Sequence, residues 1–294
     1  MSGSVHNHRE LRPLEAEVRA ALGERQPYSM VLLQSQDGLC VYRVWLDGEP
    51  AILKYMSDVP ERREITNYAL LQSLGVPMAK VLAKGESYLL LEDLSCSDSL
   101  RLGMRDDLAD PTVAVALAEW YRTLHRAGTR VAALEGLWAE SDLISADALI
   151  ALRERFPEAV MTWDYVLDHL VELQTRVAEL SRTLTYNDFS WTNLAVSRDG
   201  RSALMFDYGL LGRGYPYADW RNVTLALSVE AREAFASAYG SFSEREAITD
   251  SCVAPLVNLI CANRLPRFPS WADASLRAAR DGDLYTQASR LLES

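Results

Sequence analysis

The alternation of turn signals and apolar runs in the first third of the chain restricts its fold more than any other feature. Asp37-Gly38 and Asp47-Gly48 separate three β-rich runs, which are residues 30–34, 39–46 and 51–55. Asp-Gly between such runs is the strongest short signal for a β-hairpin, because both residues tolerate the positive φ of a tight turn. The sequence therefore predicts an antiparallel meander of three strands.

One helix and two more strands complete this β-rich part. Apolar residues recur at helical spacing over residues 61–74, and Gly75 ends the helix. Residues 80–83 and 88–91 read as further strands, and residues 14–22 read as a short helix that precedes the sheet. We therefore expect a five-stranded antiparallel sheet with one long helix.

Beyond residue 95 the pattern changes from strands to amphipathic helices. Helical spacing covers residues 111–127, 146–156, 161–184, 218–239 and 244–294. A single hairpin, residues 194–197 and 203–206 around the turn Arg198-Asp199-Gly200, interrupts them. The sequence predicts an α+β protein with a small sheet domain at residues 1–94 and a larger, mainly helical domain at residues 95–294.

The charge balance describes an acidic protein. The 294 residues include 41 acidic and 30 basic side chains, which gives a formal net charge of −11. Such a chain repels nucleic acid and anionic membranes as a whole and mildly attracts cationic ligands. We expect no nucleic-acid partner and no membrane partner.

Targeting and redox signals point to the cytoplasm. Residues 1–18 are polar where a signal peptide needs an apolar stretch, and the apolar run 253–262 is too short to span a bilayer. The four cysteines are scattered without CxxC spacing, which argues against a zinc cluster or a disulfide framework. We expect a cytoplasmic protein, and monomer and homodimer both stay open.

The first candidate pair for chemistry is a strand lysine and a helix glutamate. Lys54 ends the third strand, and Glu64 lies early in the following helix. Taken alone, Lys54 reads as a solvated surface residue and Glu64 as an acid that complements a helix N-terminus. Together they can form an ion pair that holds the ammonium group against two phosphates.

The second candidate pair lies on a loop between a helix end and a strand. Asp188 and Asn193 are five residues apart, among bulky residues that can fix the loop. A carboxylate here can accept a proton from a substrate hydroxyl, and an amide oxygen can bind Mg²⁺. The alternative is an Asx turn in which both side chains cap local backbone.

A third candidate carboxylate follows the second strand of the predicted hairpin. Asp207 comes directly after the apolar residues 203–206 and precedes Gly209. Because the turn at 198–200 folds the two strands together, Asn193 and Asp207 should lie at the same end of the hairpin. Two hard oxygen ligands there suit Mg²⁺ with phosphate and water completing its shell, and an acid that only ends an edge strand is a weaker reading.

A family resemblance rests on these residues in their order along the chain, which are Lys54, Glu64, Glu92-Asp93-Leu94, Asp188 with Asn193, and Asp207. The set resembles the eukaryotic-protein-kinase-like superfamily, and most closely its aminoglycoside phosphotransferase branch, which includes choline-kinase-like enzymes. The resemblance spans about residues 32–223 and includes the run 89–94 and Leu124-His125. It implies a bilobal protein-kinase-like fold with a small antiparallel-sheet N-lobe and a helical C-lobe.

The resemblance also implies roles for the residues. Asp188 corresponds to the catalytic base, and Asn193 and Asp207 correspond to the Mg²⁺ ligands. Lys54 would reach the α- and β-phosphates of ATP or GTP, and Glu64 would orient it.

The remaining nucleotide contacts follow from the same resemblance. The loop 34–39, which includes Ser35, would cover the phosphates, and the backbone of Glu92, Asp93 and Leu94 would meet the nucleobase. Asp219 resembles a structural aspartate at a helix start, and His125 resembles a packing residue.

Three departures from the family pattern accompany these matches. Tyr186 stands where the family usually has histidine, Asn187 replaces a usual glycine, and the loop 34–39 holds one glycine. These departures keep open a non-catalytic nucleotide-binding scaffold. A protein kinase fits poorly, because no Ala-Pro-Glu segment follows Asp207.

The implied reaction is transfer of the γ-phosphate of ATP or GTP to a hydroxyl of a small molecule. The acidic net charge suits a cationic acceptor such as an aminoglycoside-type antibiotic. A choline-like alcohol, a sugar or an amino-alcohol metabolite is the alternative. We expect the helical region 243–294 to complete the acceptor site.

Overall fold

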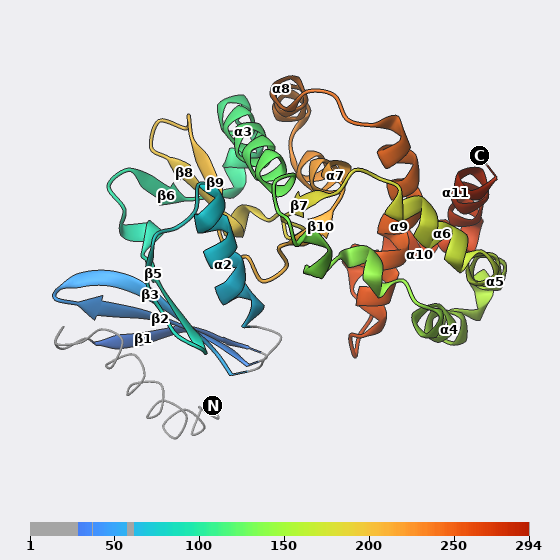
Figure 1. Cartoon of the computed structure of the whole chain (residues 1–294), viewed down its shortest axis with the longest axis horizontal. Coiled ribbons are helices and arrows are strands. Elements are labelled where there is room, and N and C mark those ends of the chain that lie inside the picture. Colours follow the sequence, from blue (N-terminus) through green and yellow to red (C-terminus); the bar gives the residue numbers. More distant parts are fainter. Residues whose placement is uncertain (1–28, 37, 58–61, 294) are drawn as a thin grey trace. The chain divides into compact units, whose positions relative to one another are not determined.

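The computed structural model describes residues 29–36, 38–57 and 62–293 (Figure 1). The helix predicted around residues 14–22 and the residue Asp37 lie outside these ranges. The chain divides into two compact units. The first runs to Trp120 and includes Ser190–Leu210 and Ser228–Ala234, and the second comprises Tyr121–Phe189, Leu211–Leu227 and Phe235–Ser294.

A five-stranded antiparallel sheet begins the first unit, which confirms the predicted sheet. Its strands are β1 (Met30–Gln36), β2 (Leu39–Leu46), β3 (Glu49–Met56), β4 (Val81–Lys84) and β5 (Tyr88–Glu92), in the order β1-β2-β3-β5-β4. Alternate residues of β2 are buried, as the period of two in a strand requires, and they pack in one cluster with Ala51 and Leu53 of β3 and with Tyr88 and Leu90.

The helix α2 (Arg63–Leu74) follows β3, close to the predicted range. Ile65, Tyr68 and Leu71 bury one side of this helix. Gly75 ends it with φ 71°, a left-handed conformation that favours glycine.

A second, three-stranded sheet also belongs to the first unit. The predicted hairpin forms β8 (Leu194–Ser197) and β9 (Ala203–Met205), and Gly200 takes the positive φ of its turn. The third strand, β6 (Leu100–Leu102), is not predicted from the sequence, and it pairs with β8 across almost a hundred residues of sequence. Because of this pairing, the first unit extends past residue 94. The boundary between two lobes at residue 94 stays a prediction.

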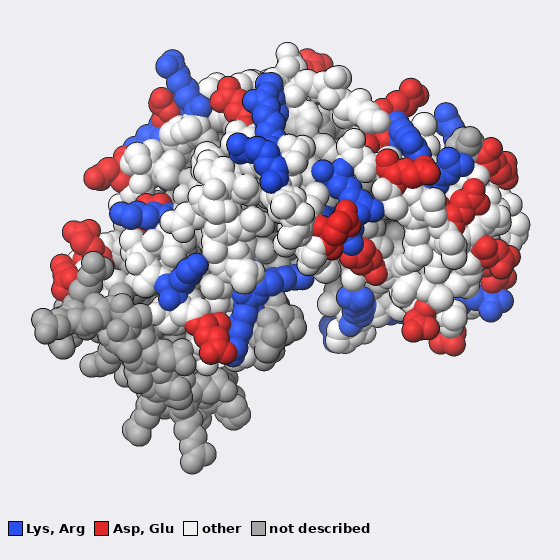
Figure 2. Space-filling view, in the orientation of Figure 1, with Lys and Arg blue, Asp and Glu red and all other residues white. Residues whose placement is uncertain are grey.

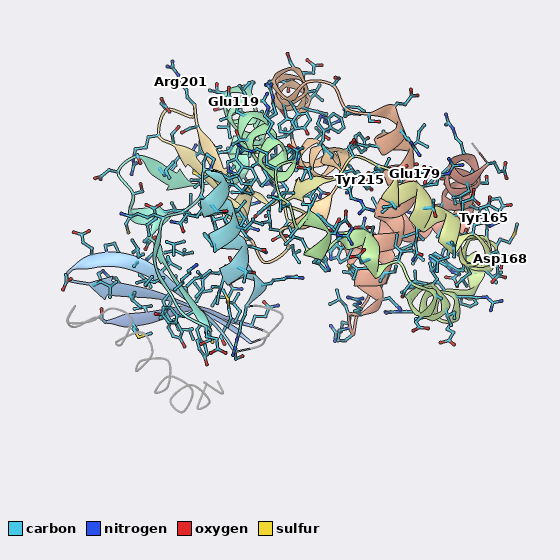
Figure 3. All side chains as sticks on the ribbon, viewed as in Figure 1. Glu119, Tyr165, Asp168, Glu179, Arg201 and Tyr215 are labelled. Atoms are coloured by element: carbon cyan, nitrogen blue, oxygen red, sulfur yellow. The ribbon has the colours of Figure 1, made fainter. Side chains whose placement is uncertain are left out.

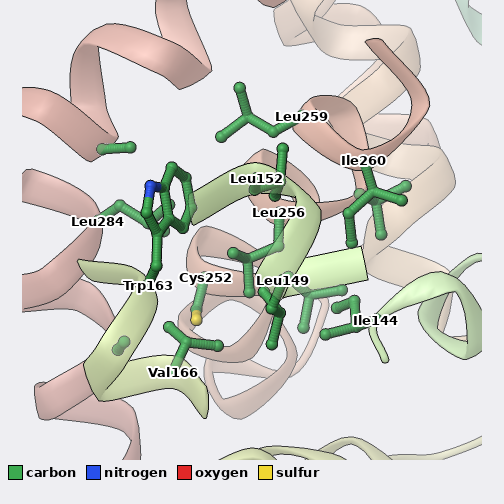
Figure 4. Packing of buried hydrophobic residues seen from close by; sticks show 14 of the residues in the cluster. Ile144, Leu149, Leu152, Trp163, Val166, Cys252, Leu256, Leu259, Ile260 and Leu284 are labelled. Carbon is green, nitrogen blue, oxygen red and sulfur yellow. The ribbon is translucent and has the colours of Figure 1, made fainter. Parts of the chain in front are cut away.

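The helix α3 (Pro111–Gly128) begins in the first unit and ends in the second. Helices of the remaining chain are α4 (Ala146–Arg155), α5 (Val160–Asp168), α6 (Leu170–Ala178), α7 (Pro216–Ala226), α8 (Val229–Tyr239), α9 (Glu244–Asn263), α10 (Asp273–Asp281) and α11 (Asp283–Leu292). Most of them surround one apolar core in which Trp163 packs among Leu149, Cys252, Leu256 and Leu284 (Figure 4).

The single helix predicted over residues 161–184 is wrong. His169 lies between α5 and α6 with φ −110° and ψ 17°, and its ring stacks on Tyr165 at 4.3 Å. Beyond α6, Leu184 belongs to β7 (Thr183–Thr185), which pairs with β10 (Gly212–Gly214). The glycines of β10 allow this close pairing, because a Cβ on Gly214 would lie 2.8 Å from Thr185 Oγ1.

The surface carries charges of both signs. On the face shown in Figure 2, acidic and basic side chains are interspersed with uncharged surface. Among the described helices, none has both the length and the apolar character needed to cross a membrane.

Candidate active site

A buried ion pair joins the sheet of the first unit to α2. The Lys54 ammonium lies 2.7 and 2.8 Å from the two carboxylate oxygens of Glu64, and both residues are buried. Burial alone would lower the pKa of Lys54, but the charges of Glu64 and Asp207 outweigh it and raise this pKa. Lys54 is therefore a fixed positive charge at neutral pH.

Asp207 approaches the same lysine from the end of β9. Its Oδ1 lies 3.1 Å from the Lys54 ammonium, and its carboxylate is 40% exposed, whereas that of Glu64 is 4% exposed. The segment after β9 is held by α2, because the Tyr208 N–H donates to Glu64 at 3.1 Å and the Asn67 amide donates to the Tyr208 carbonyl at 2.7 Å. Three residues singled out from the sequence thus meet in one cluster, and the exposed carboxylate of Asp207 is available to a ligand.

Asn193 lies at the same end of the β8–β9 hairpin as Asp207. The Phe206 N–H donates to the Asn193 carbonyl at 2.9 Å, directly beside the Leu194–Met205 pair. Asp207 has φ 65°, a left-handed conformation that aspartate accepts more readily than most residues. The hairpin therefore fixes the position from which both side chains depart.

The side chains at this end of the hairpin are too few to hold a metal ion by themselves. They suit a Mg²⁺ ion that phosphate oxygens and water also coordinate. One carboxylate and one amide oxygen are hard ligands, and Mg²⁺ is commonly bound by one or two such groups with phosphate oxygens and water. Within the described ranges, no group of three or more His, Cys, Asp or Glu side chains could hold a metal ion. A metal here would need the phosphates of a bound nucleotide.

The other sequence candidates of the first unit have structural contacts. Ser35 is exposed on β1, with Oγ 3.5 Å from Cys40 Sγ, and Glu92 accepts from the Lys80 N–H at 2.7 Å. Asp93 accepts from Ser95 and from Arg43, and burial of its carboxyl, which would raise the pKa, is outweighed by these hydrogen bonds, which lower it.

The Asp93 carboxylate thus caps local structure, and Leu94 is buried. A nucleobase contact by the backbone of residues 92–94 stays a prediction.

In the second unit, the loop that carries Asp188 is anchored by a buried carboxylate. The N–H groups of Tyr186 and Asn187 donate to the two oxygens of Asp219 at 2.8 and 2.9 Å. His125 Nε2 lies 3.1 Å from Asp219, and its Nδ1 lies 2.7 Å from the Tyr239 hydroxyl. These contacts agree with the structural roles that the sequence predicted for Asp219 and His125.

The two residues that depart from the family pattern fit this anchor. The Tyr186 ring is fully buried and packs edge-on against Tyr121, with centroids 6.4 Å apart. Asn187 has φ 65°, which asparagine tolerates in place of the usual glycine. The backbone just before Asp188 is therefore held in one conformation with these substitutions.

A pocket of about 130 Å³ lies in the second unit and includes Asn187, the neighbour of Asp188, in its wall. Arg221 and Asp250 form an ion pair in this wall at 2.7 Å. Tyr215, the residue before α7, is labelled in Figure 3, and its hydroxyl donates to Asp250 at 2.9 Å. These residues carry no local motif, and the sequence analysis missed them.

Glu140 is the most unusual residue of this wall. It is partly buried, and it makes no hydrogen bond and no ion pair with any residue of the described ranges. Burial and the charges of Asp219, Asp250 and Asp188 raise its pKa to about 7, against the opposing effect of Arg221. A positively charged ligand beside this carboxyl would stabilise its ionised form.

Comparisons with known proteins show the family and the fold of this chain. The model of the phosphotransferase enzyme family, APH, matches residues 35–251. A comparison of the sequence with curated proteins found no match. The fold is similar to that of choline kinase from Streptococcus pneumoniae, with a TM-score of 0.63 and 18% identity, over 94% of this chain and 99% of that chain.

Two further solved structures show the same fold. A macrolide 2′-phosphotransferase from Brachybacterium faecium has a TM-score of 0.58 and 17% identity, over 92% of this chain and 98% of that chain. The phosphotransferase APH(2″)-IIa, in a ternary complex with streptomycin and ATP, has a TM-score of 0.53 and 12% identity, over 99% of this chain and 100% of that chain. The fold is thus the bilobal, kinase-like α+β fold, and the chain belongs to the phosphotransferase enzyme family.

Proposed function

We propose that this enzyme transfers the γ-phosphoryl group of ATP or GTP to a hydroxyl of a small molecule. The observation that carries the proposal is the buried Lys54–Glu64 pair with the exposed carboxylate of Asp207 beside it. A lysine without partners in this position would lose its proton or stay mobile. Here Glu64 and Asp207 keep the Lys54 ammonium charged and hold it in one position.

The residues of the first unit would bind the nucleotide. The Lys54 ammonium would contact the α- and β-phosphates, and Glu64 would hold it there. Asp207 and Asn193 would hold Mg²⁺, which when bound would neutralise charge on the phosphates. The loop 34–39 with Ser35 would cover the phosphates, and the backbone of residues 92–94 would meet the base.

Asp188 would act on the acceptor hydroxyl. Its carboxylate would accept the hydroxyl proton as the oxygen attacks the γ-phosphorus, so that the products are a phosphate monoester and ADP or GDP. Because phosphoryl transfer depends mostly on positioning and on charge stabilisation, the anchoring of the loop by Asp219 also contributes, since it would hold the base in place.

A turnover assay tests this proposal. Mg²⁺-ATP would be supplied with a panel of aminoglycosides, a macrolide, choline-like alcohols and simple sugars, for the wild type and Asp188→Asn. We expect the variant to lose about 10³-fold or more in kcat while its ATP affinity changes little, because only the base is removed. The control is Asp168→Asn, an exposed carboxylate on α5, which should leave turnover unchanged.

Two results would contradict the proposal. Turnover that falls only a few-fold in Asp188→Asn would remove the base assignment. Tight ATP binding with no turnover of any acceptor in the panel would favour a nucleotide-binding scaffold.

A further inference from the structure

The pocket beside Asn187 adjoins a second pocket of about 250 Å³ in the same unit. The two share Ser141, Val177, Arg182 and Arg213 in their walls. We call them together the acceptor groove, since the proposed base, Asp188, follows one of its wall residues. Two adjoining pockets have room for a molecule larger than the reacting hydroxyl alone.

The arginines that line the acceptor groove are all neutralised by carboxylates of the same unit. Arg182 pairs with Glu135 and Arg213 pairs with Asp142 at 2.9 Å. Arg221 pairs with Asp250, which also accepts from Tyr215. These pairs leave no net charge for a ligand, since the charge of each partner is satisfied by the other.

Glu140 is the one wall carboxylate of the acceptor groove without such a partner in the part of the chain that the structure describes. Leaving a charged group partly buried and unpaired is costly, because burial removes its water without returning an opposite charge. A ligand that brings one positive charge would remove this cost. A ligand that brings several would find only one unpaired carboxylate in the wall.

The rest of the wall around Glu140 is mixed. Leu180, Val253 and Val257 line the first pocket, and so do the uncharged polar side chains of Ser141, Asn222 and Asn258. The amide and hydroxyl groups can hydrogen-bond to a ligand, but they carry no charge that would pair with a second ammonium group.

We propose that the acceptor is an alcohol with one positive charge, and that Glu140 selects it by pairing with that charge. This inference rests on the proposed function, and it narrows the acceptor class. It favours a choline-like alcohol or a molecule with a single amine over an aminosugar with several ammonium groups.

The proposal has a consequence that can be measured without turnover. The charged groups that act on Glu140 are Arg221, Asp219, Asp250 and Asp188, and its carboxyl is largely protonated below pH 7. A ligand cation favours the ionised carboxylate, so its binding at pH 6.5 should release a proton. Choline suits this measurement because its quaternary ammonium cannot titrate, and 3,3-dimethylbutan-1-ol is its uncharged analogue.

The experiment is calorimetric titration of the full-length protein with bound Mg²⁺-ADP at pH 6.5, in buffers of different ionisation enthalpy. The probes are choline, 3,3-dimethylbutan-1-ol, a macrolide with one tertiary amine, and streptomycin. We expect the singly charged probes to bind about 10- to 100-fold more tightly than the neutral analogue, and choline to release a fraction of a proton.

The variant Glu140→Gln removes the charge and keeps the shape. It should lose the preference for choline and the proton release, while its affinity for 3,3-dimethylbutan-1-ol stays the same. The control is Glu172→Gln, an exposed glutamate of α6 that lies outside both pockets, which should leave every titration unchanged.

The outcomes separate this inference from the proposed function. Streptomycin binding more tightly than the singly charged probes, or equal binding of choline and its neutral analogue, would overturn the inference, as would proton release that persists in Glu140→Gln. Phosphorylation of a neutral acceptor would keep the proposed function and overturn the inference. Choline binding through Glu140 with no phosphoryl transfer to any acceptor would support the pairing at Glu140 and overturn the proposed function.

Discussion

The two units differ in whether a buried ionisable group has a partner of opposite charge. In the first unit, Lys54 is buried against Glu64 and Asp207, and the partner charges outweigh burial, so its pKa rises and it stays ionised. In the second unit, Glu140 has no such partner among the described residues, and burial raises its pKa to about 7. A buried charge with a partner of opposite sign is a permanent part of the structure. A buried charge without one marks a place where a ligand of opposite charge would be stabilised.

The largest expected effect on stability comes from breaking the buried ion pair of Lys54 and Glu64. Lys54→Met should lower kcat by about 10²- to 10³-fold, because the positive charge at the phosphates is lost. It should also cost about 3–5 kcal/mol of unfolding free energy, since Glu64 is left buried without its counter-charge. Steady-state kinetics and urea unfolding measure the two losses.

The double variant Lys54→Met with Glu64→Leu is the control for this prediction. It should recover most of the stability but none of the turnover, because it removes both charges from the interior. Recovery of turnover in the double variant would contradict the nucleotide role of Lys54.

A smaller loss should follow Asp219→Asn, which perturbs the anchor of the loop before Asp188. One carboxylate oxygen of Asp219 is replaced by an NH₂ group, so one of the N–H donors of Tyr186 and Asn187 loses its acceptor inside the core. We expect about 1–3 kcal/mol of destabilisation and a larger fall in kcat than in nucleotide affinity. Asp281→Asn, an exposed residue at the end of α10, is the matched control, and equal effects of the two variants would contradict the anchor.

The unpaired carboxylate of Glu140, unlike the Lys54–Glu64 pair, should lower the stability of the folded protein. The folded pKa of Glu140 lies near 7 and its ordinary value is 4.5, so the folded protein binds more protons than the unfolded chain between these pH values. Unfolding free energy is therefore reduced as pH rises through this window.

Glu140→Gln removes this loss. The variant should match the wild type at pH 4.5 and exceed it by about 1–3 kcal/mol at pH 8, in thermal unfolding of the ligand-free protein. A stability difference that does not change with pH would contradict the unpaired state of Glu140.

The smallest effect belongs to an exposed pair. Arg153 and Asp164 lie 2.7 Å apart with about half of each side chain exposed. Solvent screens such a pair, so Asp164→Asn should change unfolding free energy by less than about 0.5 kcal/mol. A change as large as that of Lys54→Met would show that distance alone, without burial, decides what a charge pair contributes.

The sequence predicted the first unit better than the second for a physical reason. The hairpins of β2, β3 and β8–β9 depend on local turn residues, and Lys54 and Glu64 are ten residues apart on adjacent elements, so neighbouring sequence carries the signal. Asp207 was found because the hairpin turn places it beside Asn193.

The parts that sequence reasoning missed depend on distant residues. β7 pairs with β10 and β6 pairs with β8 across long stretches of chain, and the short apolar segment around Leu184 is equally compatible with a helix until that partner is known. Glu140 lies on a short 3₁₀ turn without a motif, and its pKa depends on burial first and then on the charges of Arg221 and Asp219, which come much later in the chain.

The most direct test of the central claim, that the Lys54–Glu64–Asp207 cluster is the nucleotide site of a working phosphotransferase, is titration of ATP into the wild type and Asp207→Asn with and without Mg²⁺. The wild type should bind ATP more tightly when Mg²⁺ is present, and Asp207→Asn should lose at least about tenfold of that gain while binding metal-free ATP as the wild type does. An unchanged Mg²⁺ dependence in Asp207→Asn would contradict the claim.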